Sequence, residues 1–287
     1  MFFKPKTASK DFQKSMLPQN RRQVLADVVK LHWGKLLLLG LLVFAFSLPL
    51  HITALLQDLY AMQLPVENIA DELPQVVLQW ISSSNTTALI EIPCFVFLAI
   101  GLAGLMRVIR QLAWEDNMYF RYDFLIGIKQ NMAQMVLLAL LVGAVRFICN
   151  YILNLSMLIT AGGVYSYLGI IPSVVLSILC VPPAAYATVC IAVYGNSFRQ
   201  NIRIGFMLFA RHPWKTLLAV VCGLVVFIPQ CIPTFYTIVF GRIISSILVP
   251  FIMLGWVLFS FNGLDEKINP KFHPELVGKG TFPQAQK

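Results

Sequence analysis

Three polar side chains recur on one face of a segment that is otherwise apolar. Arg146, Asn150 and Asn154 follow one another at four-residue intervals, and residues at this spacing share one face of a helix. An arginine in the middle of a bilayer costs at least about 2.5 kcal/mol unless it is paired or hydrated. We therefore expect this face to point into the protein, where a guanidinium beside two amides would suit an anionic group.

Glu91 is the expected partner of Arg146. It lies four residues into the apolar run 87–109, at a similar depth when the run is counted from the other membrane side. Two interpretations of this pair remain open. The pair is either a structural clamp between neighbouring helices or part of a ligand-binding site with Asn150 and Asn154. The asparagines favour the second interpretation, because a salt bridge does not need them.

Other polar residues in the apolar runs are weaker candidates for chemistry. We expect Gln230 to make an interhelical hydrogen bond and His51 and Arg242 to extend toward the outer surface. Ser245 and Ser246 are interpreted as small packing residues. All six cysteines lie in apolar runs without metal-ligand spacing, which indicates reduced packing residues rather than disulfides or a metal site.

The sequence contains no HExxH, GxSxG or Walker pattern, and no pair of acids suited to acid–base catalysis. We therefore do not expect an enzyme, a cofactor or a bound metal.

The composition places these residues in a membrane. The chain has 287 residues, of which 58% are hydrophobic and 12% charged, whereas soluble domains are about 25% charged. Continuously apolar runs favour helices over a β-barrel. We predict an all-α integral membrane protein with a basic, mobile tail at 1–20, a membrane domain at 21–262 and a polar C-terminal tail at 263–287. The predicted spans are 36–56, 87–109, 131–157, 169–194, 214–237 and 243–261.

The loops between these spans differ in charge. Of the 22 basic residues, all except Arg146 and Arg242 fall in segments on one side of the predicted topology. The long loop 57–86, expected to hold an amphipathic segment interrupted at Pro74, carries acids and no base. The positive-inside rule then places both termini in the cytoplasm. The net charge of +9 is attributed to this rule and to contact with the lipid bilayer rather than to nucleic acid.

The charged segment Arg107–Val136 is predicted to be a cytoplasmic elbow between the second and third spans. Its exposed aromatic and charged residues have two interpretations, an interfacial aromatic belt or a docking surface for a partner. The residues proposed for docking are Trp114, Tyr119, Arg121 and Tyr122.

A shift of 180 residues aligns several features of the chain. It places His32 on His212, Lys35 on Lys215 and Pro49 on Pro229. Either the six spans form three like-oriented hairpins, as parallel repeats do in transporters, or apolar helices with basic flanks resemble one another by composition alone.

Three stretches carry a resemblance to a known family. GLMRVIRQLAWEDNMYFRYDFLIGIKQN, RHPWKTLL and FNGLDEKINPKFHPELVGKG resemble the YesL-like family of bacterial membrane proteins, a domain of unknown function. The matching positions are Lys129, Gln130, Asn131, Asn269, Pro274, Lys279 and Gly280. The resemblance implies a bacterial cytoplasmic-membrane protein of about six spans. Because members of the family often neighbour carbohydrate ABC uptake systems, it also implies an accessory role in sugar import, with no catalytic residues to transfer.

Two functions therefore stand at this point. The first is an accessory protein that binds a carbohydrate ABC transporter or a membrane sensor through its elbows. The second is a small solute transporter with a polar site around Arg146.

Overall fold

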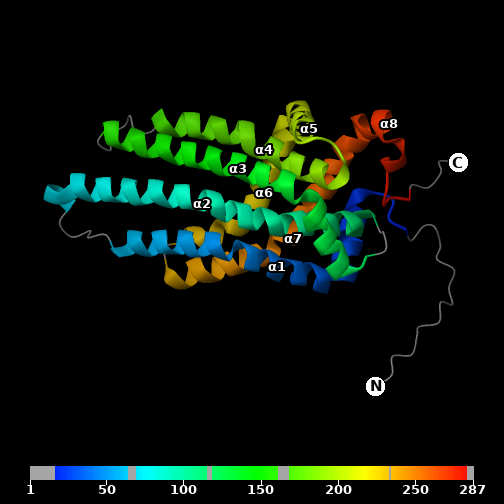
Figure 1. Ribbon diagram of the computed structural model, residues 1–287, viewed down its shortest axis with the longest axis horizontal. Helices are drawn as coiled ribbons and strands as arrows, with labels where there is room; N and C mark the ends of the chain where they lie inside the picture. Colours follow the sequence, from blue (N-terminus) through cyan, green and yellow to red (C-terminus); the bar gives the residue numbers. More distant parts are fainter. Residues whose placement is uncertain (1–16, 64–68, 115–117, 161–167, 233, 283–287) are drawn as a thin grey trace, which may run out of the picture.

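The computed structural model describes residues 17–63, 69–114, 118–160, 168–232 and 234–282, and these ranges contain helices and no strand (Figure 1). Within these ranges, six helices are long and apolar enough to cross a membrane, which confirms the predicted all-α membrane architecture. The elements are α1 (Arg21–Gln63), α2 (Ile69–Trp114), α3 (Phe120–Thr160), α4 (Ile170–Val193), α5 (Phe198–Arg211), α6 (Pro213–Leu224), the 3₁₀ helix η3 (Val225–Cys231), α7 (Phe235–Lys267), α8 (Asn269–Phe272) and the 3₁₀ turn η4 (Pro274–Leu276).

The first three helices are longer than a bilayer is thick. They contain 43, 46 and 41 residues, or about 60–70 Å at the helical rise, against a hydrocarbon core of about 30 Å. The predicted outer loop 57–86 is therefore wrong, because α1 continues to Gln63 and α2 begins at Ile69. The expected interruption at Pro74 is also absent. Pro74 lies in the second turn of α2 and has no backbone N–H to donate. It therefore removes one helical hydrogen bond near the start of α2, and the helix continues through it.

The boundary between the fifth and sixth spans also differs from the prediction. The fifth span changes from α6 to the 3₁₀ helix at Val225 and ends at Cys231, not at 237. The sixth begins at Phe235 rather than at 243, so residues 238–242, which the predicted spans leave as a connection, lie inside α7. Pro229 favours this early ending because it cannot donate a helical hydrogen bond. Thr234 then caps α7, its side chain accepting a hydrogen bond from the Thr237 amide.

The two histidines aligned by the 180-residue shift occupy equivalent breaks. His32 has non-helical backbone angles inside α1, where the amphipathic first turns meet the apolar span. His212 separates α5 from α6 and is followed by Pro213 at the first helical position, which prevents α5 from continuing. Both spans are thus entered from a basic helix through a break at histidine, which favours the repeat interpretation for the first and third hairpins.

The two described chain ends meet at one end of the bundle, here called the α8 end (Figure 1). Arg21, at the start of α1, donates to Asp265 at 2.7 Å and to the Lys279 carbonyl at 2.5 Å. Gly280 has φ +83°, and a Cβ there would lie 2.2 Å from the carbonyl of Ala113. We call these contacts the terminal clasp. The predicted boundary at 262 is wrong as a structural limit, because α7 continues to Lys267 and the following residues fold against α1 and α2.

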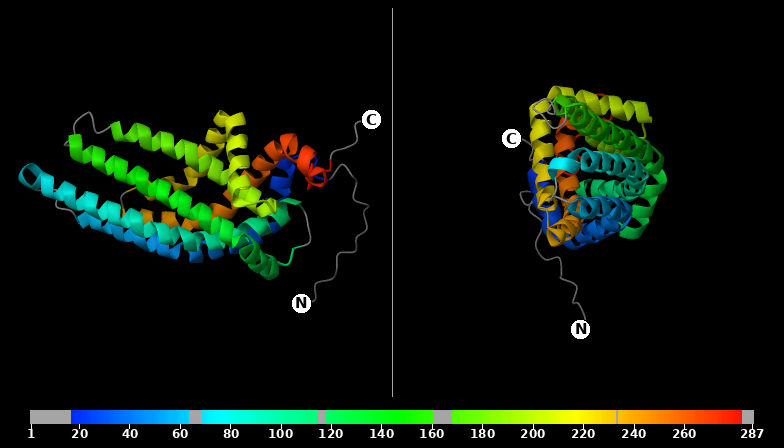
Figure 2. Two further views of the ribbon diagram at one scale, coloured as in Figure 1. Left: turned by 45° about the horizontal axis from the view of Figure 1, so that its top comes forward. Right: turned by 90° about the vertical axis from the view of Figure 1, so that its left-hand side faces the viewer.

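The two halves of the bundle are packed differently. Buried aliphatic residues concentrate toward the α8 end, among them Leu105, Met106 and Ile109 of α2 and Leu264 of α7. Toward the opposite end, α3 and α4 expose large apolar side chains such as Leu155 and Ile171. An apolar surface of this extent suits lipid rather than water. Figure 2 shows the long helices extending away from the α8 end.

Candidate functional site

The predicted pair between α2 and α3 is present. Nε of Arg146 donates to a carboxylate oxygen of Glu91 at 2.6 Å. The two partners have different environments, because Glu91 is 2% exposed and Arg146 is 55% exposed. The antiparallel hairpin of α2 and α3 explains the contact. Gly143, one turn before Arg146, faces Ile92 of α2 across this hairpin.

The two asparagines contact the same neighbouring helix. Asn150 donates to the side-chain oxygen of Asn85 at 3.1 Å and accepts a hydrogen bond from Ser84 at 3.2 Å. Asn154 donates to Asn85 at 2.7 Å and is almost fully buried. Asn154 therefore fixes α3 to α2, whereas Asn150 also borders a cavity between the spans.

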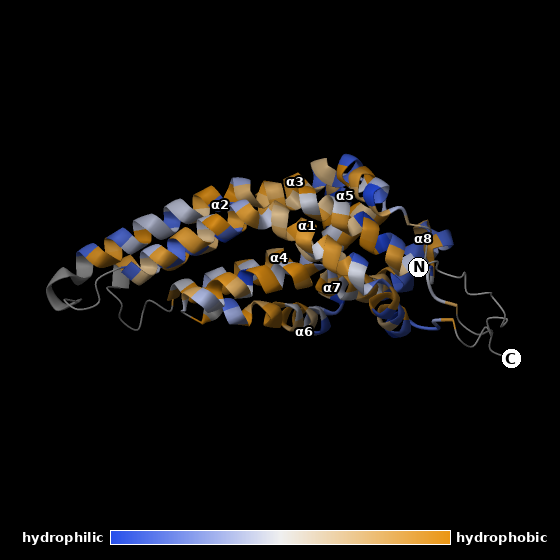
Figure 3. Ribbon diagram, turned by 90° about the horizontal axis from the view of Figure 1, so that it is seen from below, coloured by the Kyte–Doolittle hydropathy of each residue, from blue (hydrophilic) through white to orange (hydrophobic). Residues whose placement is uncertain are grey.

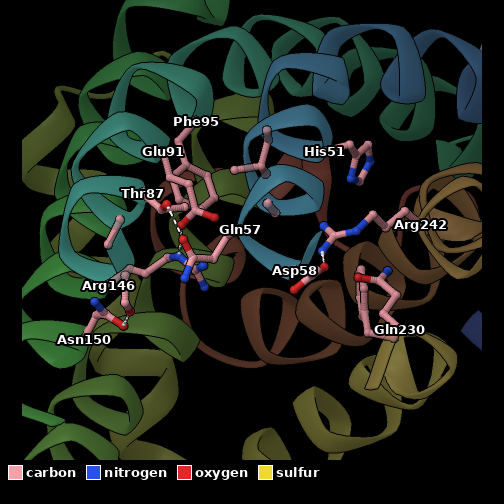
Figure 4. A pocket seen from close by; sticks show the side chains of 15 residues that line it. His51, Gln57, Asp58, Thr87, Glu91, Phe95, Arg146, Asn150, Gln230 and Arg242 are labelled. Atoms are coloured by element: carbon pink, nitrogen blue, oxygen red, sulfur yellow. Dashed lines mark hydrogen bonds and ion pairs between the residues drawn. The ribbon is translucent and has the colours of Figure 1, made fainter. Parts of the chain in front are cut away.

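This cavity has a volume of about 420 Å³ and lies among α1, α2, α3, η3 and α7 (Figure 4). Its size falls in the range of small-molecule sites. Arg146, Glu91 and Asn150 line one part of it. The other polar residues of its wall are His51, Gln57, Asp58, Ser84, Thr87, Gln230 and Arg242.

A second ion pair lines the cavity and was missed from the sequence. Arg242 of α7 donates to Asp58 of α1 at 2.5 Å, and only 14% of the Arg242 side chain is exposed. The expectation that Arg242 extends to the outer surface is therefore wrong. The error came from placing Arg242 between two spans rather than in α7, and the sequence gives no local signal that pairs it with Asp58.

Hydrogen bonds from α7 and η3 complete the wall. His51 and Ser246 Oγ lie 2.7 Å apart, and Gln230 donates to Ser245 Oγ at 2.5 Å. The predicted hydrogen bond of Gln230 is thus confirmed. Both serines are buried, in agreement with their interpretation as packing residues.

Several donors around the cavity are not used within the protein. The side-chain oxygen Oε1 of Gln57 accepts hydrogen bonds from the hydroxyls of Ser83 and Thr87. The amide nitrogen Nε2 of Gln57 and the Nε of Arg242 are buried without a partner. In the described part of the chain, the terminal nitrogens of Arg146 make no hydrogen bond, since its contact with Glu91 uses Nε. The cavity therefore combines two balanced ion pairs with unused N–H donors.

The elbow residues proposed for docking are separated by the fold. Trp114 stacks on Phe261 with 6.0 Å between ring centroids, and the Lys279 ammonium lies 4.1 Å from its ring. Trp114 thus packs against the C-terminal residues. Tyr119 and Tyr122 remain 74% and 66% exposed, with the exposed Arg121 between them.

A buried carboxylate sets the conformation of this segment. Asp123 accepts hydrogen bonds from the Tyr119 amide at 2.8 Å and from Gln111 at 2.9 Å. These bonds fix the start of α3 against α2 and leave both tyrosines at the surface.

Among the described residues, no group of histidines, cysteines and acids has the arrangement of a metal site. Five cysteines are free thiols in the described side chains, and Cys231 lies outside them.

Comparison with protein families, curated proteins and solved structures finds no match. The resemblance to the YesL-like family therefore stays a prediction. The fold and the site together define the class of protein, a multi-pass helical membrane protein with a charged cavity between its spans.

Proposed function

We propose that this protein binds a small polar solute in the cavity beside Arg146 and carries it across the membrane. The observation behind the proposal is that Arg146, Gln57 and Arg242, which line one cavity, each carry an N–H donor without a partner among the described residues. Buried donors without acceptors are costly, and a ligand that supplies acceptors removes this cost.

The donors favour a solute with a carboxylate or a phosphate. The two terminal nitrogens of Arg146 form the fork that binds such groups through two parallel hydrogen bonds. Glu91 orients this fork by holding Nε at 2.6 Å. Because the two ion pairs balance, the empty cavity carries no net charge from them, and the ligand is recognised through geometry as well as charge.

Transport is favoured by the irregular span next to the cavity. Gln230 and Phe227, which belong to η3, line the cavity where the fifth span changes from α to 3₁₀. Interrupted spans border the substrate sites of several transporter folds, because half-helix ends and unwound backbone face the substrate there. In this proposal, η3 and the start of α7 open and close the site.

The experiment is a ligand screen followed by uptake. The protein in detergent is melted with small carboxylates, small phosphates and neutral sugars of similar size, and any stabilising solute is tested in proteoliposomes. We expect carboxylates or phosphates to raise the melting temperature. Arg146→Lys, which keeps a cation for Glu91 but loses the fork, should bind at least about tenfold more weakly. Equal stabilisation by neutral sugars, or uptake unchanged in Arg146→Lys, contradicts the proposal.

A second function is favoured by the surface of the elbow. Tyr119 and Tyr122 are large, exposed and adjacent to Arg121, and aromatic residues with arginine are typical of protein-binding surfaces. We propose this patch as the docking face of an accessory protein in carbohydrate uptake, in a bacterial cytoplasmic membrane with both termini in the cytoplasm. Crosslinked recovery from native membranes tests it. One transporter or sensor in stoichiometric amount supports docking, and recovery of this protein alone excludes it.

A further inference from the structure

Helices α5 and α8 both lie at the α8 end of the bundle (Figure 1), and residues of α5, α7 and α8 line a groove there. Two depressions of about 420 and 560 Å³ meet there, sharing Met207, Ile268 and Phe272. The floor of the groove is thus apolar. This site is distinct from the cavity beside Arg146, and no residue lines both.

The rim of the groove is basic. Arg203, Arg211, Lys267 and Lys271 line it. Arg211 is paired with Glu266, yet its Nη1 is buried without a hydrogen-bond partner. Arg203, Lys267 and Lys271 form no ion pair with any residue that the structure describes. An unused buried donor beside three unpaired cations indicates a site for an anionic group.

Helix α5, which carries Arg203 and Arg211 of this rim, is amphipathic. Its buried face, including Gly205 and Leu208, packs against α4 and α7, where a Cβ at Gly205 would lie 2.3 Å from the Pro183 carbonyl. Its other face exposes Phe206 and Met207 beside Arg203. Figure 3 shows hydrophilic and hydrophobic residues alternating along α5. A helix with this pattern suits the membrane interface.

The next span begins immediately beyond the groove. Trp214, the second residue of α6, is 82% exposed, and Leu218 and Val221 continue an exposed apolar face along the span. Tryptophan is enriched at the membrane–water interface. An exposed tryptophan and an exposed apolar face therefore follow the groove directly along the chain, as expected for a groove at headgroup depth.

We infer that this groove binds the headgroup of an anionic phospholipid, with the cations on its rim around the phosphate and Met207, Ile268 and Phe272 against the first acyl carbons. Basic pockets between helices at a membrane surface bind anionic headgroups in this way. The combination of an apolar floor and a basic rim fits a molecule that is anionic at one end and apolar at the other. A soluble anion would use the rim alone.

The test compares two double variants with the same loss of charge. Lys267→Gln with Lys271→Gln alters the groove, whereas Arg22→Gln with Lys30→Gln alters exposed cations of α1 at the same end. Purified protein is titrated with phosphatidylglycerol or phosphatidylcholine, and bound lipid is counted by native mass spectrometry. We expect wild type to retain phosphatidylglycerol selectively. The groove variant should bind it about 30-fold more weakly, and the α1 variant should bind it like wild type.

Several results overturn the inference. These are equal binding of both lipids, equal losses in both double variants, or displacement of phosphatidylglycerol by the same concentration of glycerol phosphate. If the groove variant does not fold, Arg203→Gln takes its place and must also weaken phosphatidylglycerol binding. Arg146→Lys should leave this binding unchanged, so failure here is distinguishable from failure of the proposed solute site.

Discussion

Glu91 and Arg146 share an ion pair, but only one of them is buried. The carboxylate is 2% exposed and the guanidinium is 55% exposed on the cavity side. The desolvation of the buried Glu91 carboxylate is therefore compensated by Arg146, whereas the half-exposed Arg146 can also be hydrated or bind a ligand. A simple clamp would bury both partners, so the asymmetry favours a site in which Glu91 presents Arg146 to the cavity.

This asymmetry predicts unequal effects of removing each partner. Arg146→Met leaves a buried carboxylate without a partner and should destabilise the protein by about 3–5 kcal/mol. Glu91→Gln leaves a half-exposed cation and keeps a hydrogen-bond acceptor, so it should cost about 1 kcal/mol. Thermal unfolding of both variants in one detergent measures the difference. The reverse order would show that Arg146 is not hydrated through the cavity.

Gln57→Glu separates the structural role of Gln57 from its role in binding. The carboxylate still accepts from Ser83 and Thr87, whose hydroxyls lie 2.7 and 2.8 Å from the present amide oxygen. The unused donor, however, becomes an acceptor that repels an anionic solute. We expect the variant to fold with a lower unfolding temperature, because the new carboxylate is partly buried near Asp58 and Glu91, while affinity for a stabilising carboxylate or phosphate falls at least about tenfold. Undiminished affinity would remove Gln57 from the binding wall.

The same substitution at two glycines of α1 should have opposite effects. At Gly40, a Cβ would lie 2.3 Å from the Ile247 carbonyl of α7, so Gly40→Ala must push these helices apart. At Gly34 there is nothing within 4 Å, and alanine adds up to about 1 kcal/mol of helix stability. Chemical denaturation should show Gly40→Ala destabilised and Gly34→Ala unchanged or stabilised. A tolerated Gly40→Ala would mean that α1 and α7 do not meet this closely.

The terminal clasp gives a prediction for the C-terminal residues. Arg21→Gln removes the charge that holds Asp265 and the Lys279 carbonyl, whereas the neighbouring Arg22 is exposed. Limited proteolysis should cleave the Arg21→Gln protein after 267 much faster than wild type, with a loss of about 2–4 kcal/mol in stability. Arg22→Gln is the matched control. Equal cleavage of the two variants would show that the clasp does not order these residues.

Gly280→Ala tests the same clasp from the other side. Its positive φ and the contact with Ala113 both exclude a side chain, so alanine should release the tail from α2. Gly255→Ala, where nothing lies within 4 Å, should not. Exchange of amide hydrogens in 274–282 would report the release, and protection equal to wild type would contradict the packing described above.

The parts of the fold that the sequence predicted follow from local pattern. Apolar runs predict helices wherever lipid excludes backbone alternatives, and the depth of Arg146 and Glu91 could be counted along them. The failures were at positions where tertiary contacts decide. Helical pattern continues across 57–86, but only packing against neighbouring helices shows that α1 and α2 extend there. Arg242 and Asp58 lie 184 residues apart, and no pattern within either span indicates that they meet.

The terminal clasp has a consequence for how the protein is made. Synthesis proceeds from the N-terminus, so Arg21 leaves the ribosome long before Asp265 and Lys279, the groups that neutralise and bind it. Until those residues are synthesised, α1 can enter the membrane, but Arg21 in its first turn has neither Asp265 nor the Lys279 carbonyl to bind. The α8 end therefore closes last, after the sixth span has been synthesised. A nascent chain that stops just before Asp265 would contain the six described spans but could not form the terminal clasp. Its α8 end would therefore be open to the proteases of cellular quality control.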